Sequence, residues 1–232
     1  MKLDLSNVKN GTVLDISLNE LNVNFKLLQP EQRIIELYKI FQPEEIMLTS
    51  SFATTSAYLL HLFSTYKPEQ EVIFINTGYH FEETLTYKEY LSKIYNLRVR
   101  EVKAEDYKHE FTSSDKTWTK DPDYCCTINK VEPIEKLKKK YKVWVSGLMS
   151  WQSNHRANLN IFEVRDNILK FYPLLDVSRE QREVYIKDHL LPFHPLQSKG
   201  YFSVGCIHCT KPGKGRDGRW NNSPKTECGL HL

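Results

Sequence analysis

Short apolar runs that alternate with helical segments are the sequence feature that most restricts the fold of this chain. Glu71–Ile75 is almost continuously apolar, as is typical of a strand in a parallel sheet that is covered on both faces. Glu45–Ser50 predicts a second buried strand, and Ala57–Phe63 predicts a helix that packs on the sheet, because it is apolar on most sides. This alternation indicates an α/β fold with a largely parallel sheet flanked by helices.

The alternation extends over most of the chain. Residues 1–29 predict a short helix or a loop, and the chain from Leu191 onward predicts a loop-rich region. Ser178 and Gln181 have the spacing of a capping box, which marks the start of a helix. Helices are predicted at 31–41, 81–94 and 178–189, strands at 97–102 and 142–147, and a strand pair at 162–164 and 167–172.

Polar residues follow three of these strands, at Thr49 to Phe52, Asn76 to Gly78 and Ser146–Gly147. Ligands of parallel sheets bind beyond the carboxyl ends of the strands, so these ends predict a nucleotide-like pocket. The turn at 51–56 would aim N–H groups and a helix dipole at an anion, although an ordinary Ser/Thr-capped connection has the same pattern. The candidate substrate-binding residues at these strand ends are Ser50, Ser51, Phe52, Asn76, Thr77 and Gly78.

Composition narrows the class of protein. The 232 residues carry a formal charge of +3, which is too small to indicate a nucleic-acid partner by itself. We find no signal-peptide pattern at the N-terminus and no apolar run long enough to cross a bilayer, so a cytoplasmic protein without a membrane partner is expected. Five cysteines, an odd number, suit metal binding or catalysis better than a disulfide framework.

Four of the cysteines form two pairs, Cys125–Cys126 and Cys206–Cys209, which lie roughly 80 residues apart. Two adjacent cysteines are poorly placed to bind a single zinc ion together. They could more easily bind separate corners of a [4Fe–4S] cluster, so a cluster with four thiolate ligands explains the two pairs as well as zinc does, or better. A zinc site, unrelated cysteines and a vicinal disulfide at 125–126 stay open as alternatives. His208 is expected to be a neighbouring or surface residue and not a ligand.

The fifth cysteine, Cys228, follows a basic segment, 211–219, that is expected to be a flexible tail. Nearby cations favour the thiolate, so Cys228 is a candidate nucleophile, and the alternative is an exposed cysteine without function. The guanidinium groups of Arg216 and Arg219 have paired donors that suit phosphate and sulfate oxygens. The alternative is that each arginine is simply a solvated charge on the tail.

These motifs together resemble the assimilatory adenylyl-sulfate (APS) reductases, the iron–sulfur branch of the wider family of APS and 3′-phospho-APS (PAPS) reductases. The resemblance runs from about residue 31 to the C-terminus. It rests on Cys-Cys-Thr-Ile-Asn-Lys-Val-Glu-Pro at 125–133, Cys-x-x-Cys at 206–209, Gly-Arg-Asp-Gly-Arg-Trp at 215–220 and Lys-Thr-Glu-Cys-Gly-Leu-His at 225–231, with support from 74–81 and 194–205.

The resemblance implies an adenine-nucleotide α-hydrolase-like (PP-loop-like) fold. It also implies an oxidoreductase of sulfate assimilation that reduces APS to sulfite and AMP through an S-sulfocysteine, with electrons from thioredoxin or a similar dithiol protein. Residues 1–209 would form one nucleotide-binding reductase domain that includes the cluster site, and 210–232 a mobile catalytic tail. The resemblance leaves a homo-oligomer open.

Roles carried over by motif cover the following residues. The cluster ligands would be Cys125, Cys126, Cys206 and Cys209, and the nucleophile would be Cys228. Lys130 would lie between cluster and substrate, and Arg156 would contact substrate. Arg216, Arg219 and His231 would close over the phosphate–sulfate group.

Two segments depart from the family pattern. Residues 147–153 read Gly-Leu-Met-Ser-Trp-Gln-Ser where Gly-Leu-Arg-Arg-Glu-Gln-Ser is usual, so part of the anion site is expected to be rebuilt. Asn76 replaces the usual aspartate. A PAPS-reducing or dual-specificity enzyme is therefore one alternative, and a zinc-bearing nucleotide-binding module without redox activity is another. A PP-loop ATPase is disfavoured because the 51–56 turn lacks glycine.

Overall fold

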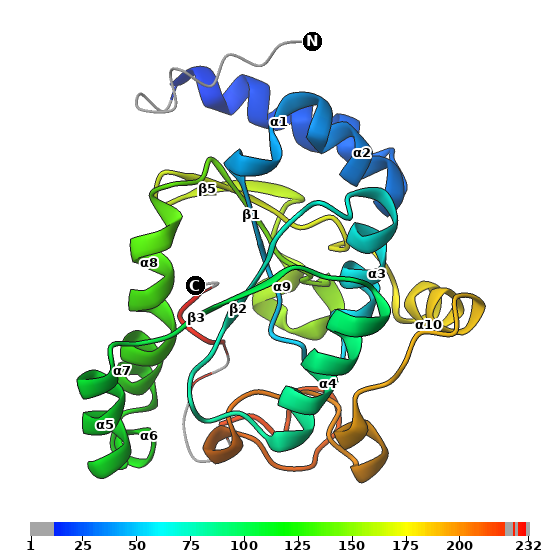
Figure 1. Ribbon diagram of the computed structural model, residues 1–232. Coiled ribbons are helices and arrows are strands. Elements are labelled where there is room, and N and C mark those ends of the chain that lie inside the picture. Colours follow the sequence, from blue (N-terminus) through cyan, green and yellow to red (C-terminus); the bar gives the residue numbers. More distant parts are fainter. Residues whose placement is uncertain (1–11, 221–224, 226, 231–232) are drawn as a thin grey trace.

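A central sheet organises the chain, and the computed structural model describes residues 12–220, 225 and 227–230, with side chains from residue 18 (Figure 1). The sheet has six strands in the order β3-β2-β1-β4-β6-β5. All neighbouring strands are parallel except β5, which pairs antiparallel with β6. The strands are β1 (Ile46–Thr49), β2 (Val72–Ile75), β3 (Val99–Val102), β4 (Val143–Val145), β5 (Phe162–Arg165) and β6 (Ile168–Phe171).

The helices confirm the predicted α/β architecture and add elements to it. They are α1 (Thr12–Lys26), α2 (Pro30–Ile40), α3 (Ser56–Tyr66), α4 (Glu82–Ile94), α5 (Asp106–Ser114), α6 (Thr117–Lys120), α7 (Pro122–Cys126), α8 (Glu132–Lys138), α9 (Asn154–Ala157) and α10 (Arg179–Asp188). Short 3₁₀ turns span Pro43–Glu45, Ser150–Gln152, Pro195–Lys199 and Ile207–Cys209, and Thr127–Val131 is a π-helical turn. The predicted capping box of Ser178 and Gln181 opens α10.

Two apolar layers sandwich the sheet. Helices α3, α4 and α10 lie on one side of it and α8 on the other (Figure 1). Along β1 the side chains alternate, so that Ile46 and Leu48 join the larger layer while Met47 joins the smaller layer with Ile134 of α8. Each such fully buried apolar side chain contributes about 1.5–3 kcal/mol. This double burial explains why the strands read as continuous apolar runs.

The strand order sets the position of the ligand crevice. From β1 the chain moves to β2 and β3 on one side, whereas β4 pairs with the opposite edge of β1 and leads on to β6. The order therefore reverses between β1 and β4, which is where open α/β sheets bind ligands. Ser50 and Ser146 directly follow these two strands.

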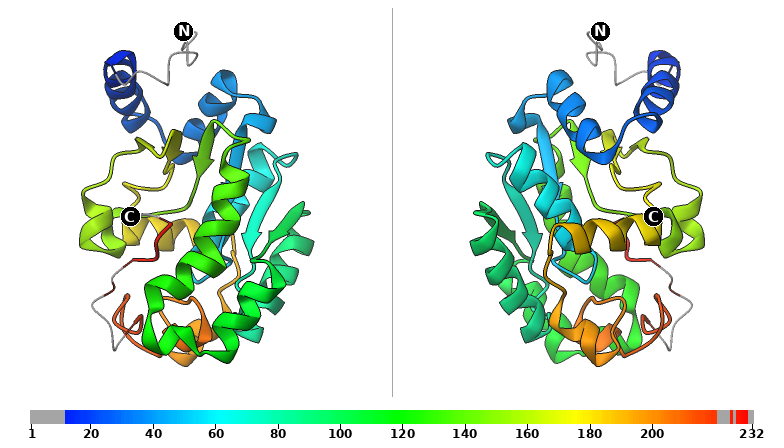
Figure 2. Two further views of the ribbon diagram at one scale, coloured as in Figure 1. Left: turned by 90° about the vertical axis from the view of Figure 1, so that its left-hand side faces the viewer. Right: turned by 90° about the vertical axis from the view of Figure 1, so that its right-hand side faces the viewer.

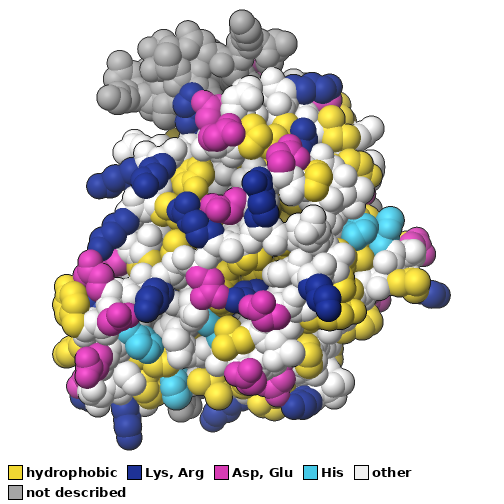
Figure 3. Space-filling view, viewed as in Figure 1, with side chains coloured by type: hydrophobic (Ala, Val, Ile, Leu, Met, Phe, Trp, Pro, Cys, Tyr) yellow, Lys and Arg dark blue, Asp and Glu magenta, His cyan; other side chains and the backbone are white. Residues whose placement is uncertain are grey.

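Basic and acidic side chains are interspersed on the face shown in Figure 3. Pairs such as Lys103–Asp106 and Lys136–Glu105 are largely exposed, so each contributes little to stability. Among the described residues, no helix is both long and apolar enough to pass through a membrane.

Candidate active site

A cavity of about 210 Å³ lies beyond the carboxyl ends of β1 and β4. Ser50 and Ser51 line it from β1, Ser146 and Gly147 line it from β4, and residues 54–56 line it at the start of α3. The structure thus brings two of the three predicted strand ends together in one site.

The turn between β1 and α3 is held in an unusual conformation. Phe52 has a φ of 48°, in the left-handed region that a bulky residue rarely adopts, and its ring is fully buried edge-on to Phe74. Ser50 Oγ accepts a hydrogen bond of 3.1 Å from the Phe52 amide. The first N–H of α3, that of Ser56, donates to the Ala53 carbonyl at 3.0 Å. Thr55, at the N-cap, makes no side-chain cap bond, so its hydroxyl leaves the next N–H groups of the first turn open to an anion. This geometry favours the anion-binding interpretation over an ordinary capped turn.

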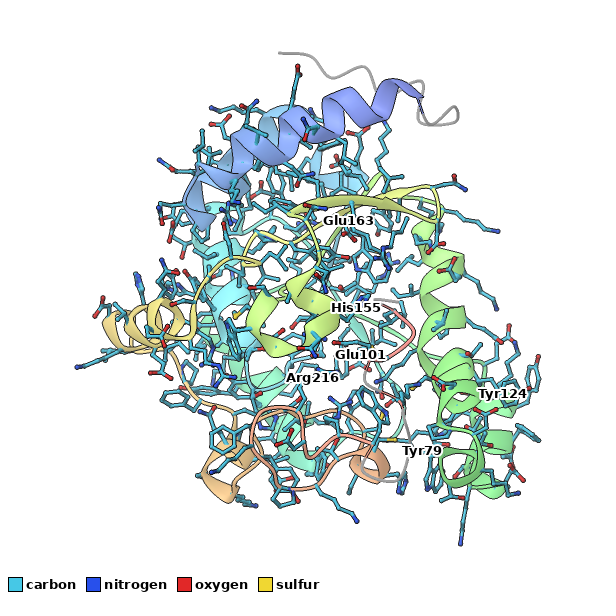
Figure 4. The ribbon with its side chains drawn as sticks, turned by 180° about the vertical axis from the view of Figure 1, so that it is seen from behind. Tyr79, Glu101, Tyr124, His155, Glu163 and Arg216 are labelled. Carbon is cyan, nitrogen blue, oxygen red and sulfur yellow. The ribbon has the colours of Figure 1, made fainter. Side chains whose placement is uncertain are left out.

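Four of the predicted cations and the predicted nucleophile line this cavity. Figure 4 shows Arg216 between the short helix α9 and the loop of the C-terminal segment. The guanidinium of Arg219 lies directly on Gly205, where an added Cβ would come within 2.2 Å of Nη2. The predicted site residues that line the cavity from distant parts of the chain are Lys130, Arg156, Arg216, Arg219 and Cys228.

Other predicted substrate-binding residues lie elsewhere. Of the described ones, Phe52, Asn76, Thr77 and Gly78 are not among the residues that line the cavity. Asn76 bonds Glu101 and the Gly78 amide, and Gly78 has a φ of +72° and packs under a histidine ring. Asn76 and Gly78 thus stabilise the turn after β2. His231 lies outside the described residues.

The four paired cysteines line a second, smaller pocket next to the cavity. An antiparallel bridge between His80 and Cys206 brings the C-terminal pair to the turn after β2, and Thr77 Oγ1 lies 3.4 Å from Cys206 Sγ. Thr77 therefore contacts a cysteine. His208, as expected, is exposed, and it stacks on Trp118 with ring centroids 3.8 Å apart.

Burial disfavours ionisation of two thiols in this pocket. Burial raises the pKa of Cys125 to about 12 and that of Cys209 to about 11, so neither ionises readily on its own. Burial also opposes ionisation of Cys206, but the Lys130 ammonium and the Thr77 hydroxyl outweigh it and lower that pKa. Within the described part of the chain, no three His, Cys, Asp or Glu side chains are grouped so as to hold a single metal ion.

Lys130 connects the two pockets. It sits in the π-helical turn directly after Cys126 and lines both the cavity and the cysteine pocket. Burial disfavours its ammonium, but the thiols of Cys206, Cys126 and Cys228 outweigh that effect and raise its pKa. The lysine therefore faces the paired cysteines and the candidate nucleophile together.

Residues of the segment 147–153 form one wall of the cavity. Met149, where the family pattern has arginine, is fully buried. Trp151 donates a 3.0 Å hydrogen bond from Nε1 to the Val177 carbonyl, and the Arg179 guanidinium lies 4.7 Å from its ring centre. Arg179 also lines the cavity, so a cation from α10 stands at the wall where basic residues are missing.

Two glycines of the basic segment 211–219 lie close to neighbouring backbone. The Lys211 amide donates a 2.8 Å hydrogen bond to the Gly218 carbonyl, and an added Cβ at Gly218 would come within 2.0 Å of the Lys211 oxygen. An added Cβ at Gly213 would likewise come within 2.7 Å of the Gly218 amide nitrogen. These two glycines serve close backbone packing, whereas only Gly215, at φ +55°, has open space around it.

Two buried polar residues of the site were not predicted. Glu227, next to the candidate nucleophile, has a fully buried carboxylate. Lys170, in β6, is 2% exposed and donates a 3.1 Å hydrogen bond from Nζ to the Leu230 carbonyl. The sequence held a signal for Lys170, which is a lone lysine within the apolar run 167–172. Lysines are almost never fully buried without a partner, so a lysine in a buried strand indicates a nearby partner.

Comparison with known proteins decides the family. Residues 45–212 match the phosphoadenosine phosphosulfate reductase domain. An adenosine 5′-phosphosulfate reductase of Staphylococcus epidermidis is 33% identical over 229 residues, which cover 94% of this chain and 93% of that protein. The chain belongs to the phosphoadenosine phosphosulfate reductase family. The resemblance read from the motifs is thereby confirmed, and so, at the level of the family, is an oxidoreductase that acts on sulfur.

Solved structures confirm the fold of this reductase-family chain. A PAPS reductase of Candida auris, crystallised as a phosphate complex, aligns with a TM-score of 0.71 and 24% identity over 91% of this chain and 99% of that chain. An FMN adenylyltransferase of Candida glabrata aligns with a TM-score of 0.58 and 17% identity over 90% and 70% of the two chains. The expected PP-loop-like fold is therefore present.

Replacing Lys170 by methionine is expected to stabilise the reductase-family fold by about 2 kcal/mol at pH 7. Burial lowers the pKa of Lys170 to about 8, so at pH 7 the folded protein carries a charge that its surroundings disfavour. As pH rises through 8 the folded state releases this proton before the unfolded state does, so the advantage of methionine shrinks.

Thermal unfolding at pH 7 and pH 9.5 checks this expectation, which corresponds to a rise of roughly 4–8 °C in Tm at pH 7. Lys142→Met is the matched control, because Lys142 is 60% exposed and pairs with Glu45 at the surface. Equal Tm values for Lys170→Met and wild type at pH 7 would show that burial does not penalise this charge.

Proposed function

We propose that the chain reduces APS to sulfite and AMP, with Cys228 as nucleophile and thioredoxin or a similar dithiol protein as reductant. The observation that carries the proposal is that Cys228 shares one cavity with Lys130, Arg216 and Arg219, while the other cysteines line a separate pocket. A thiol among cations suits attack on a doubly anionic sulfonucleotide. The S. epidermidis relative, named an APS reductase, supports APS as substrate.

The chemistry balances with one nucleophile and one external dithiol. The Cys228 thiolate attacks the sulfonate sulfur, an S–S bond forms, and the S–O bond to AMP breaks. The product is an S-sulfocysteine. A thiolate of the partner then attacks Cys228 Sγ and expels sulfite, and the second partner thiol releases Cys228 as the partner becomes a disulfide. The dithiol supplies both electrons.

Polar and cationic groups at the cavity suit both the phosphate and the sulfonate of the substrate. The first turn of α3 and the hydroxyls of Ser50 and Ser51 suit the phosphate. Arg216 and Arg219, which lie on either side of the 217–218 turn, suit the sulfonate oxygens. Lys130 faces Cys228 and would stabilise the charge that develops as AMP leaves.

The donor set of the second pocket fits a [4Fe–4S] cluster, which Cys125, Cys126, Cys206 and Cys209 would hold. Such a cluster would supply fixed charge and rigidity beside the substrate. The chain's own contribution is that Thr77 and Lys130 contact the Cys206 thiol and favour its ionised form. The cytoplasmic location and the single domain with a catalytic tail remain predictions of this proposal.

Sulfite release from purified holoprotein tests the function. With APS and a thioredoxin system, we expect sulfite and AMP in equal amounts. With APS and no thiol, we expect intact Cys228 to gain one SO₃ group by mass spectrometry. PAPS is tested as a second substrate, because Arg179 adds a cation to the wall formed by 147–153 and PAPS carries an additional phosphate. Zinc in place of iron, with neither nucleotide consumed, would favour the non-redox nucleotide-binding module.

A further inference from the structure

Glu227 is a buried carboxylate one residue before Cys228, and the mechanism above does not use it. Its side chain has no exposed surface. It accepts hydrogen bonds from both Nε and Nη2 of Arg156, each at 2.8 Å, and from Ser153 Oγ at 2.7 Å. Arg216 Nη2 adds a fourth bond at 3.0 Å. Such a bidentate, charge-assisted site fixes both the position and the angle of the carboxylate.

The site for this carboxylate is built into the domain. Arg156 and Ser153 belong to α9 and its N-cap, and Arg156 Nη1 is bonded to Gln152 of the preceding turn. Burial of Glu227 opposes its ionised form, but Arg156 outweighs that effect and lowers the pKa of the carboxyl group. The segment 227–230 accordingly lies beside α9 in both views of Figure 2.

Arg156 therefore has a different partner from the one that the family resemblance implies. Its Nε and Nη2 face the Glu227 carboxylate, so the fork that would clasp a substrate anion is occupied by the tail itself. Arg216 links the two, because it lines the cavity and also bonds Glu227. The Arg216 guanidinium thus takes part both in docking of the tail and in the lining of the cavity.

The chain is also held on the far side of Cys228. Leu230 packs against the apolar layer of Met47, Ile73 and Ile134, and its carbonyl accepts from the buried Lys170. An added Cβ at Gly229 would come within 3.2 Å of the Val131 side chain, so the backbone passes close to the domain. Cys228 is suspended between these two attachments.

We propose that Glu227 is a positioning residue that latches the tail to Arg156 and so places Cys228 in the cavity. When the latch is closed, Cys228 faces Lys130 and Arg216; when it opens, the thiol becomes accessible to a partner protein. The latch itself follows from the contacts of Glu227, and only its consequence for turnover rests on the proposed function.

Alkylation of Cys228 by iodoacetamide, located by peptide mass spectrometry, tests the latch without any assay of activity. Glu227→Gln keeps the shape and removes the charge, and we expect it to raise the alkylation rate at least tenfold. Arg156→Lys keeps a charge but loses the bidentate fork, so it should give a smaller rise in the same direction. Combining the two changes should add little to the larger single effect, since both open one contact.

Asp217→Asn is the matched control. It removes a carboxylate from the same tail at an exposed position, and this carboxylate forms no ion pair within the described part of the chain. The alkylation rate should therefore stay within twofold of wild type. Near-ultraviolet circular dichroism identifies any variant that fails to fold. If Glu227→Gln does not fold, the alkylation rate of Arg156→Lys tests the latch instead. An unchanged alkylation rate in folded Glu227→Gln and Arg156→Lys would overturn the latch.

Turnover separates positioning from general stability. With APS at saturation and no thiol, Glu227→Gln should form S-sulfocysteine about 100-fold more slowly, whereas its affinity for AMP should change less than threefold. A purely structural role would lower stability and leave the rate of the folded fraction unchanged, which would contradict positioning. If wild type consumes no sulfonucleotide but the alkylation pattern holds, the proposed function fails and the latch stands.

Discussion

Replacing Cys228 by serine is expected to abolish sulfite release, with a loss of at least about 10³-fold in kcat. The serine hydroxyl is a far weaker nucleophile than a thiolate. Even a sulfated serine would contain no S–S bond for a dithiol to break, so the second half-reaction would be blocked as well. Sulfite release from APS with a thioredoxin system is the measurement. Cys228 lines the substrate cavity and not the cysteine pocket, so iron content should be unchanged.

Cys209→Ser is the matched comparison, because Cys209 lines the cysteine pocket and not the cavity. It should lower iron content and visible absorbance. The two serine variants should thus separate into one that is inactive and iron-loaded and one that is iron-depleted. If Cys228→Ser releases sulfite at the wild-type rate, the nucleophile is another group and the mechanism proposed above is wrong.

The sheet was predictable because its strands are buried on both faces. In β2, all of Val72–Ile75 is apolar, and the run stands out from its polar neighbours. Helices α6 and α7, between β3 and β4, were missed because they are four and five residues long, too short for an apolar period to repeat. Their position is set by tertiary contacts, such as Asn129 bonding the Cys125 carbonyl at 3.0 Å.

The site was predictable where chemistry left a motif. The cysteine pairs and the tail arginines stand out by residue type and spacing, Lys130 comes from the family motif, and the fold brings them together. Glu227 escaped notice because a glutamate in a charged tail is usually solvated, and nothing in the sequence marks its burial. The predicted flexibility of the tail stays a prediction, but Gly213 and Gly218 within it serve close backbone packing. The burial of Glu227 and the packing of these glycines are contacts that only the folded chain creates.

Lys130→Met is the second substitution with a large expected effect, a loss of about 10²–10³-fold in kcat/KM for APS. Methionine keeps the length of the side chain but removes the cation that faces Cys126, Cys206 and Cys228. The attack step would lose a fixed charge beside the nucleophile and the leaving oxygen. Because the ground-state complex also holds other cations, such as Arg219, most of the loss should appear in kcat.

Single-turnover formation of the S-sulfocysteine isolates the step in which Lys130 acts, and iron content shows whether the cysteine pocket is intact. Lys199→Met is the control, since Lys199 is 61% exposed and pairs with Glu83 at the surface. An unchanged kcat/KM in iron-loaded Lys130→Met would remove Lys130 from the reaction. A slower first step with iron retained would instead place the lysine at the substrate, because loss of a purely structural contact with the thiols would first release iron.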